Sequence, residues 1–213
     1  MSKAITIAGR KIGRSSPPYV IAELSANHNG RLETALRIIE EAKLAGADAV
    51  KLQTYTPDTI TLDSNGEGFV IHGGLWDGRS LYDLYREAHM PWDWHKVLFE
   101  HAQRTGITIF SSPFDSTAVD LLESLGAPAY KIASFEAVDL PLIRYVASTG
   151  KPMIISTGMA DAEEIAAAIP APWGRLVRFP HAGHGAWRDE PEEALDVLRR
   201  FITEAGAPAA STA

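Results

Sequence analysis

The chain has 213 residues, of which 46% are hydrophobic, so it is long enough to bury a core and to form a single domain. Its 20 basic and 27 acidic residues give a net charge of -7, which argues against a general role in binding nucleic acid or a membrane surface. It contains no cysteine, which excludes disulfides and thiolate metal sites. The N-terminus lacks the apolar run of a signal peptide and no segment is long enough to span a bilayer, so we expect a cytoplasmic protein.

Strand and helix patterns alternate along the first 169 residues. A small β-hairpin is predicted over 5–13, and five short apolar runs then predict strands. The predicted strands cover 19–24, 48–53, 107–111, 129–133 and 153–157. The segments between them carry apolar residues at helical spacing, and the expected N-caps of two of these helices are Ser116 and Asp139.

This alternation predicts an α/β protein with a parallel sheet. No Gly-x-Gly-x-x-Gly follows the first main strand, so nothing favours a dinucleotide-binding fold. Polar residues at the ends of several strands favour a TIM-type (β/α) barrel instead. A complete barrel has eight strand–helix units and typically ~250 residues. Five units are visible here, or six with a strand at 175–179, so we expect an incomplete barrel.

Two lysines interrupt otherwise apolar strands. Lys51 lies in Ala-Val-Lys-Leu-Gln, and Lys131 lies in Tyr-Lys-Ile-Ala-Ser. A lysine within a buried strand is costly unless an anion or a fixed partner meets it. Both strands end in small polar residues, at the place where a barrel presents side chains to its substrate. The pattern predicts an enzyme that acts on a phosphorylated or carboxylated metabolite.

The connection over 55–91 is long and rich in glycine. Connections of this length inside a compact domain are usually functional or mobile. We expect this connection to cover the substrate. The alternative is a surface loop that has no role in binding.

Five motifs at predicted strand ends resemble, in order, those of the sialic acid synthase family. They are Ile-Ala-Glu-Leu-Ser-Ala-Asn-His-Asn-Gly at 21–30, Lys-Leu-Gln-Thr at 51–54, Ser-Ser-Pro-Phe-Asp at 111–115, Lys-Ile-Ala-Ser at 131–134 and Ser-Thr-Gly-Met at 156–159. The segments 74–85 and 91–95 resemble the pseudaminic acid synthase branch more than the N-acetylneuraminate branch. The resemblance covers about residues 1–169.

The resemblance implies a transferase of carbohydrate biosynthesis. Such an enzyme condenses phosphoenolpyruvate with an open-chain acetamido sugar and releases phosphate by C–O cleavage, here to give pseudaminic acid. The resemblance also implies a divalent metal, Mn²⁺ or Mg²⁺. A homo-oligomer or other self-association is expected as well, because an incomplete barrel leaves an open sheet edge.

The chemistry of phosphoenolpyruvate suggests which residues bind it. Its phosphate and carboxylate need fixed cations, which Lys51 and Lys131 supply. Gln53 lies on the same face of its strand as Lys51 and could hold the substrate. Hydroxyl donors to the phosphate are expected from three serines at strand ends: Ser112, Ser134 and Ser156.

Two carboxylates are candidates for catalysis. Glu23 ends the first main strand and is expected to bind a sugar hydroxyl or relay a proton, kept ionised by the cations around it. Glu136 follows the fourth strand and is expected to transfer a proton or position water. Two structural alternatives stay open: Lys51 and Glu23 could form a plain ion pair, and Asn27 and His28 could be architectural.

After residue 169 the family pattern ends, which predicts a division into a partial barrel at 1–169 and a tail at 170–213 with one amphipathic helix. The sequence around Gly183-His184 resembles the C-terminal end of α/β-hydrolases, but no Gly-x-Ser-x-Gly nucleophile elbow occurs in the chain. In one interpretation the sequence is spliced or truncated and the tail packs without a functional role. In a second interpretation, His181 and His184 replace the metal-binding histidines that the family carries in its later units. Two other functions therefore stay open: an inactive truncated synthase fragment that keeps its phosphate-binding strand ends, and a hydrolase-like module.

Overall fold

The computed structural model describes residues 5–13 and 16–169. Its main unit is a parallel sheet in the order β3-β4-β5-β6-β7, so each strand pairs with its neighbour in sequence. A doubly wound sheet would reverse this order at a switch point, whereas a barrel keeps it. The strands are β3 (Ile21–Glu23), β4 (Ala49–Thr54), β5 (Thr108–Pro113), β6 (Tyr130–Ile132) and β7 (Met153–Ile155). The predicted fold class, part of a TIM-type barrel, is confirmed, and the strand predicted at 175–179 lies outside the described residues.

A helix follows each of the five strands along the chain, as the apolar spacing predicted. These helices are α1 (Leu32–Leu44), α4 (Trp92–Thr105), α5 (Ser116–Ser124), α6 (Leu140–Ser148) and α7 (Ala162–Ala168). Asp139 caps α6, as predicted, by accepting a hydrogen bond from the backbone N–H of Leu142. The predicted cap of α5 was wrong by one residue: Asp115 is the N-cap and Ser116 is the first helical residue. The Asp115 carboxylate accepts from the N–H groups of Thr117 and Ala118, which a carboxylate does as well as a hydroxyl.

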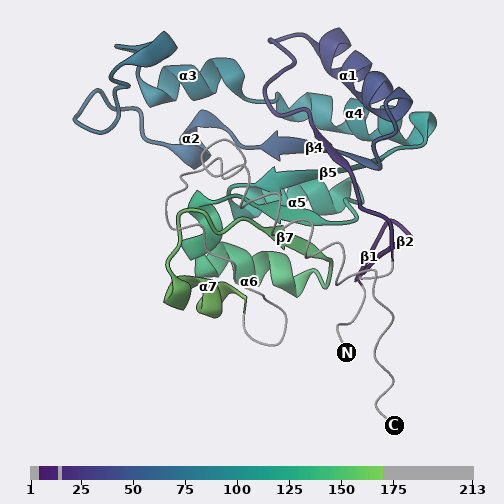
Figure 1. Ribbon diagram of the computed structural model, residues 1–213. Coiled ribbons are helices and arrows are strands. Elements are labelled where there is room, and N and C mark those ends of the chain that lie inside the picture. The colour runs from purple at the N-terminus through teal and green to yellow at the C-terminus, as the bar shows by residue number, and fades with distance from the viewer. Residues whose placement is uncertain (1–4, 14–15, 170–213) are drawn as a thin grey trace, which may run out of the picture.

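The connection over 55–91 has more regular structure than the sequence suggested. It contains α2 (Pro57–Ile60), the 3₁₀ turn η1 (Gly74–Trp76) and α3 (Leu81–Ala88). An isolated antiparallel bridge joins Val70 to Ser80 at the base of the η1 segment. Figure 1 shows α2 and α3 beyond the arrowheads of β4 and β5, so this connection lies at the carboxyl ends of the strands.

The sheet separates two apolar regions. On its helix-covered face, Val50 and Leu52 pack with Leu98 of α4 and Leu122 of α5. On its other face, a smaller cluster contains Ile7, Ala49, Phe110 and Ala129. The period of two along each strand explains the division, because alternate side chains point to opposite faces.

The hairpin of β1 (Ile5–Ile7) and β2 (Arg10–Ile12) closes the amino-terminal end of this inner face. Its Ile7 is fully buried in the inner cluster, and Arg10 forms an ion pair with Asp48 at the start of β4. In Figure 1 the hairpin lies at the opposite end of the sheet from α2 and α3. The carboxyl ends of the strands are therefore the end left for a site.

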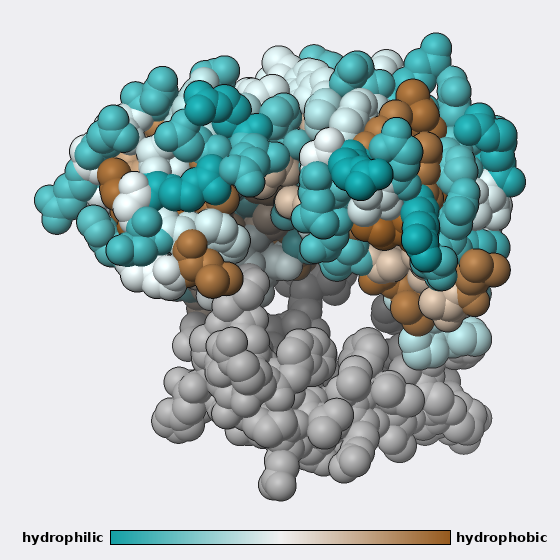
Figure 2. Space-filling view, turned by 90° about the horizontal axis from the view of Figure 1, so that it is seen from above, coloured by the Kyte–Doolittle hydropathy of each residue, from teal (hydrophilic) through white to brown (hydrophobic). Residues whose placement is uncertain are grey.

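The view from above, onto the side of α1, α3 and α4, is mostly hydrophilic with scattered hydrophobic residues (Figure 2). This agrees with the amphipathic character of α1 and α4, whose buried residues belong to the core against the sheet. In the described part of the chain, no helix has both the length and the apolar character needed to cross a membrane.

Candidate active site

The inner face of the sheet changes from apolar to polar toward the carboxyl ends of the strands. The inner-cluster residues Ala49 of β4, Phe110 of β5 and Ala129, just before β6, are each followed two positions later by a polar residue on the same face. These polar residues are Lys51, Ser112 and Lys131. The predicted lysines and one predicted serine thus share one layer of side chains inside the curved sheet.

Lys51 lies between two of the other predicted residues. Its Nζ is 2.8 Å from Oε2 of Glu23 and 3.4 Å from Oγ of Ser112. The Lys51 side chain is 8% exposed, whereas that of Glu23 is 55% exposed. The ion pair that the sequence left open is therefore present. Because Glu23 approaches from the open side, the pair lies at the surface of the site and leaves the carboxylate accessible.

Lys131 has neutral partners. Its Nζ donates to Oγ of Ser156 and to the carbonyl oxygen of Ile132, both at 2.6 Å. In the part of the chain that the structure describes, no carboxylate oxygen lies within 4.0 Å of this ammonium group. Lys131 is thus a partly buried cation held by dipoles, which leaves its charge available to an anionic ligand.

The pKa of Lys131 is lowered to about 8, first by burial and then by the positive charge of Lys51. The carboxylates of Glu23 and Glu136 act in the opposite direction. All three groups are therefore near enough for their charges to affect the pKa of Lys131. Two cations that repel each other would both be stabilised by a bound dianion.

Glu136 belongs to the 3₁₀ turn η2 (Phe135–Val138), which follows β6. Its Oε2 is shielded from solvent, and among the described residues it has no hydrogen-bond partner. Burial raises the pKa of the Glu136 carboxyl group, and the nearby Asp139 adds to the effect. A carboxyl group with a raised pKa and a free oxygen can exchange a proton with a ligand.

The other predicted residues lie at the same end of the sheet. Gln53 is opposite Ser112 in the β4–β5 register, and buried Ser134 directly precedes η2.

The predicted metal ligands, His181 and His184, lie outside the described residues. Within residues 5–13 and 16–169, no group of three His, Asp or Glu side chains could hold a metal ion. The part of the site that is described therefore does not fit a metal by itself.

An aromatic cluster over the strand ends was not predicted. Tyr55, which follows β4, makes edge-to-face contacts with Tyr85 of α3 and with Phe114, at centroid distances of 5.6 Å and 5.4 Å. Burial raises the pKa of Tyr55 to about 12. Burial, and secondarily the charge of Glu136, also raises the pKa of Tyr85. The contact between Tyr55 and Tyr85 places α3 at the carboxyl end of β4, where the 55–91 connection was expected to cover the substrate.

A second feature was not predicted from the sequence: a buried hydrogen-bonded group formed by Thr54, His95 and Ser111. Oγ1 of Thr54 lies 2.9 Å from Nε2 of His95 and 2.6 Å from Oγ of Ser111. Burial lowers the pKa of His95 to about 4, so this imidazole is neutral near pH 7. One signal was available: His95 shares the buried face of α4 with Leu98 and Ala102.

His28 is buried in the turn between β3 and α1, which is consistent with the architectural alternative, although its Nε2 has no hydrogen-bond partner among the described residues. The side chain is 1% exposed, and its Nδ1 accepts a hydrogen bond from the backbone N–H of Gly30. The edge of its ring meets Trp94 of α4 at a centroid distance of 5.5 Å. These contacts fix the turn between β3 and α1 and involve none of the charged side chains of the site.

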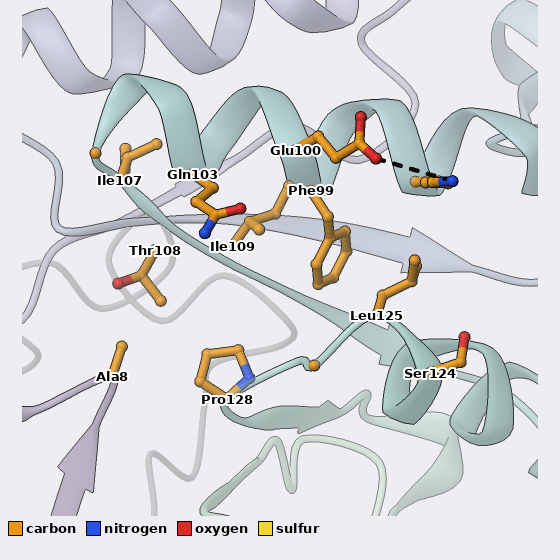
Figure 3. Close-up of a pocket in the computed structure, with 13 residues that line it drawn as sticks. Ala8, Phe99, Glu100, Gln103, Ile107, Thr108, Ile109, Ser124, Leu125 and Pro128 are labelled. Atoms are coloured by element: carbon orange, nitrogen blue, oxygen red, sulfur yellow. Dashed lines mark ion pairs between the residues drawn. The ribbon is translucent and has the colours of Figure 1, made fainter.

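An open cavity of about 850 Å³ lies elsewhere, between α4, β5 and the end of α5 (Figure 3). Its walls include Phe99, Ile109 and Leu125, and it reaches Ala8 of the β1–β2 turn. It therefore lies near the amino-terminal end of β5, whereas β/α-barrel enzymes place their sites at the carboxyl ends. Lys96 and Glu100 on its wall pair with each other, at 4.0 Å. We assign the candidate site to the carboxyl ends and not to this cavity.

Comparison with known proteins identifies the family of the chain. The model of the NeuB family matches residues 38–176. The chain is 56% identical over 147 residues to the pseudaminic acid synthase of Campylobacter jejuni. This alignment covers 69% of the present chain and 43% of the Campylobacter protein. It is 54% identical over 153 residues to the pseudaminic acid synthase of Helicobacter pylori, an alignment that covers 72% of the present chain and 45% of the Helicobacter protein. The chain thus spans less than half the length of these curated relatives.

Comparison with solved structures supports the fold. The N-acetylneuraminic acid synthetase of Leptospira borgpetersenii, crystallised with citrate, superposes with a TM-score of 0.68 at 33% identity, over 79% of this chain and 54% of that one. A truncated 3-deoxy-D-arabino-heptulosonate 7-phosphate synthase from Thermotoga maritima has a TM-score of 0.55 at 13% identity, which supports the fold alone. By its motifs, its match to the family and its fold, the chain belongs to the NeuB family of sialic acid synthases, in the branch of the pseudaminic acid synthases.

Proposed function

We propose that the chain carries the phosphoenolpyruvate-binding half of a pseudaminic acid synthase. The reaction joins C3 of phosphoenolpyruvate to the aldehyde carbon of an open-chain acetamido sugar, and water then adds at C2. Breaking the bond between C2 and its oxygen releases phosphate and leaves a nonulosonic acid. The identity to the two pseudaminic acid synthases supports this choice of product within the family.

One observation carries the proposal: Lys51 and Lys131, on two different strands, lie on the same inner face of the sheet, each two positions after a residue of the inner apolar cluster. Hydroxyl groups of Ser112 and Ser156 lie beside them, at 3.4 Å and 2.6 Å from the respective Nζ atoms. A phosphate needs this combination of charge and short donors. Gln53 and Ser134 complete the proposed binding set.

The two carboxylates have different proposed roles. Glu136 is partly buried and has a raised pKa, and its shielded Oε2 has no hydrogen-bond partner among the described residues, so it is suited to give a proton to the aldehyde oxygen as the C–C bond forms. Glu23 is paired with Lys51 and half exposed. Its proposed role is to orient Lys51 and to bind a sugar hydroxyl.

A divalent metal, Mn²⁺ or Mg²⁺, belongs to the proposal through the family resemblance. The described residues do not assemble a site for it. Its proposed ligands remain His181 and His184, and none of the steps above depends on them. The cytoplasmic location and the division of the chain at residue 169 also stay predictions.

Phosphate release tests the proposal directly. The 213-residue chain is mixed with the acetamido sugar and phosphoenolpyruvate labelled with oxygen-18 at the bridging position, with and without Mn²⁺. Cleavage of the C–O bond should put the label into phosphate, in a 1:1 ratio with the new nonulosonic acid. Label that stays with the organic product contradicts the proposed bond cleavage.

The same measurement separates the alternatives. Phosphoenolpyruvate binding without phosphate release would identify an inactive fragment that keeps its phosphate-binding strand ends. Ester hydrolysis that a serine-directed reagent blocks would favour the hydrolase-like module instead. If calorimetry detects no binding of phosphoenolpyruvate, the assignment of the site is wrong.

Self-association is proposed separately. In the described sheet, β3 and β7 each pair on one side only, and such edges can pair with another chain. Size-exclusion chromatography with light scattering should show a species larger than 23.1 kDa. A monomer at micromolar concentration would contradict this.

A further inference from the structure

A chain of hydrogen bonds runs behind the candidate site, on the helix-facing side of β4 and β5. Nδ1 of His95 lies 3.2 Å from the carbonyl oxygen of Pro91, and its Nε2 lies 2.9 Å from Oγ1 of Thr54. Oγ1 of Thr54 continues the chain to Oγ of Ser111, at 2.6 Å. The side chains of Thr54, His95 and Ser111 are all 0% exposed.

The direction of every bond in this chain is fixed. The Pro91 carbonyl can only accept, so Nδ1 of His95 carries the proton and donates. Because the imidazole is neutral, its Nε2 accepts from the hydroxyl of Thr54. The Thr54 oxygen then accepts from the hydroxyl of Ser111. Each hydrogen in this chain therefore has one donor atom and one acceptor atom. Reversing any of the bonds would leave a buried polar group without a partner.

These polar groups lie in an interface that is otherwise apolar. Leu52 and Leu98, their neighbours on β4 and α4, are also 0% exposed. Apolar side chains at the same three positions would fill the space without burying polar groups, so packing alone does not require the network.

The position of the network suggests what it does. Thr54 directly follows Gln53, and Ser111 directly precedes Ser112. Gln53 and Ser112 are register partners across β4 and β5, and their side chains point to the opposite face, into the site. Holding Thr54 and Ser111 on the outside therefore fixes the backbone that carries Gln53 and Ser112 on the inside.

The same corner anchors the covering segment. The indole Nε1–H of Trp92, at the start of α4, donates to the carbonyl oxygen of Tyr55, at 3.3 Å. Thr54, the last residue of β4, and Tyr55, which follows it, are thus both hydrogen-bonded to the first turn of α4. The connection over 55–91 begins and ends at this point.

We propose that His95 is a positioning residue, whose Nδ1-protonated imidazole aligns the carboxyl ends of β4 and β5 so that Gln53 and Ser112 meet the phosphorylated substrate. This inference rests on the proposed function, because it assumes that the site binds phosphoenolpyruvate. His95 itself does not touch the substrate. Its effect passes through Thr54 and Ser111.

Binding calorimetry with phosphoenolpyruvate on the 213-residue chain tests the proposal. His95→Leu removes both hydrogen bonds and should raise the Kd roughly three- to tenfold, the effect of one well-placed hydrogen bond in the site. His95→Gln keeps an acceptor for Thr54 and should restore most of the affinity. Leu98→Ala is the control, because it cuts a cavity on the same helix without touching the network. It should lower the Tm and leave the Kd unchanged.

Nitrogen-15 NMR of labelled histidine gives a readout that is independent of binding. The His95 resonances should show a protonated Nδ1 and an unprotonated Nε2, unchanged between pH 6 and pH 9. Protonation at Nε2 instead would reverse the direction of the chain and overturn the proposal.

The outcomes are distinguishable. If His95→Leu lowers the Tm as much as Leu98→Ala does and leaves the Kd unchanged, the network is structural and the inference is wrong. If Lys131→Ala also leaves the Kd unchanged, the proposed function itself has failed. Where His95→Leu does not fold, Thr54→Val carries the test, because it removes the hydroxyl and keeps the shape. An unchanged Kd for Thr54→Val would count equally against the inference.

Discussion

Nζ of Lys131 lies 2.6 Å from Oγ of Ser156, so the cation of β6 is held by a hydroxyl that follows the neighbouring strand β7. Lys51, on β4, is held differently, by the carboxylate of Glu23. The two lysines of the site are therefore unequal before any ligand arrives. Lys51 is largely neutralised, whereas Lys131 keeps a free charge and has the lowered pKa. We expect Lys131 to contribute more to the binding of an anion.

Replacing Lys131 should weaken the binding of phosphoenolpyruvate strongly. We expect Lys131→Ala to raise the Kd roughly 10- to 100-fold, because a charge-assisted hydrogen bond is lost in a partly buried site. Isothermal titration calorimetry at pH 7 measures this. Lys151→Ala is the matched control: Lys151 pairs with Glu123 at 2.5 Å, at the amino-terminal side of β7, and its loss should leave the Kd unchanged. Equal Kd values for Lys131→Ala and the parent chain would contradict the assignment.

The affinity for phosphoenolpyruvate should fall as the pH rises through about 8. Below this pKa Lys131 is protonated in the free protein and attracts the anion. Above it the free protein loses the proton, and binding must first restore it, so the Kd increases with pH. Calorimetry in buffers of different ionisation enthalpy at pH 9 should reveal proton uptake on binding. In Lys131→Met the slope between pH 7.5 and pH 9.5 should disappear, and a slope that persists would point to another group.

Much of this site could be predicted because its signals are local. A lysine inside an apolar strand stands out in the sequence, and alternation along the strand places Lys51 and Gln53 on one face. The contact of Thr54 with His95 has no such signal, since the two residues are 41 positions apart and meet only when α4 packs on β4. The helices within 55–91 were not predicted because they are short: α2 has four residues and α3 has eight, and the glycine-rich stretch lies between them.

The error at the start of α5 has a simple cause and gives a test. Asp115 and Ser116 are both good N-cap residues, so sequence preference does not choose between them. In the structure Asp115 accepts the hydrogen bonds, so Asp115→Ala should lower the free energy of unfolding by about 0.5–2 kcal/mol. Ser116→Ala, inside the helix, should change it by less than about 0.5 kcal/mol. Urea denaturation compares the two, and the opposite order would restore the capping role to Ser116.

His95 should make the protein sensitive to mild acid. Its pKa is lowered to about 4 in the folded chain from 6.5. Below pH 6.5 the unfolded chain therefore binds a proton that the folded chain refuses, so stability is full above pH 6.5 and falls as the pH drops toward 4. The loss should amount to roughly 1–3 kcal/mol. Urea denaturation at pH 7 and pH 5 measures it, and His95→Gln should lose less stability between these values than the parent. An identical loss in both proteins would assign the acid sensitivity elsewhere.

Replacing each of the two carboxylates of the site should have a different kinetic effect. Glu136→Gln keeps the shape of the side chain but removes an acid with a raised pKa, so it should lower kcat by about 10²–10⁴-fold with little change in the KM for phosphoenolpyruvate. Glu23→Gln breaks the 2.8 Å ion pair and frees the charge of Lys51, so its main effect should fall on binding. Phosphate release at saturating sugar and Mn²⁺ measures both variants. If Glu23→Gln lost turnover while Glu136→Gln kept it, the proton-transfer role would belong to Glu23, and the buried oxygen of Glu136 would need another explanation.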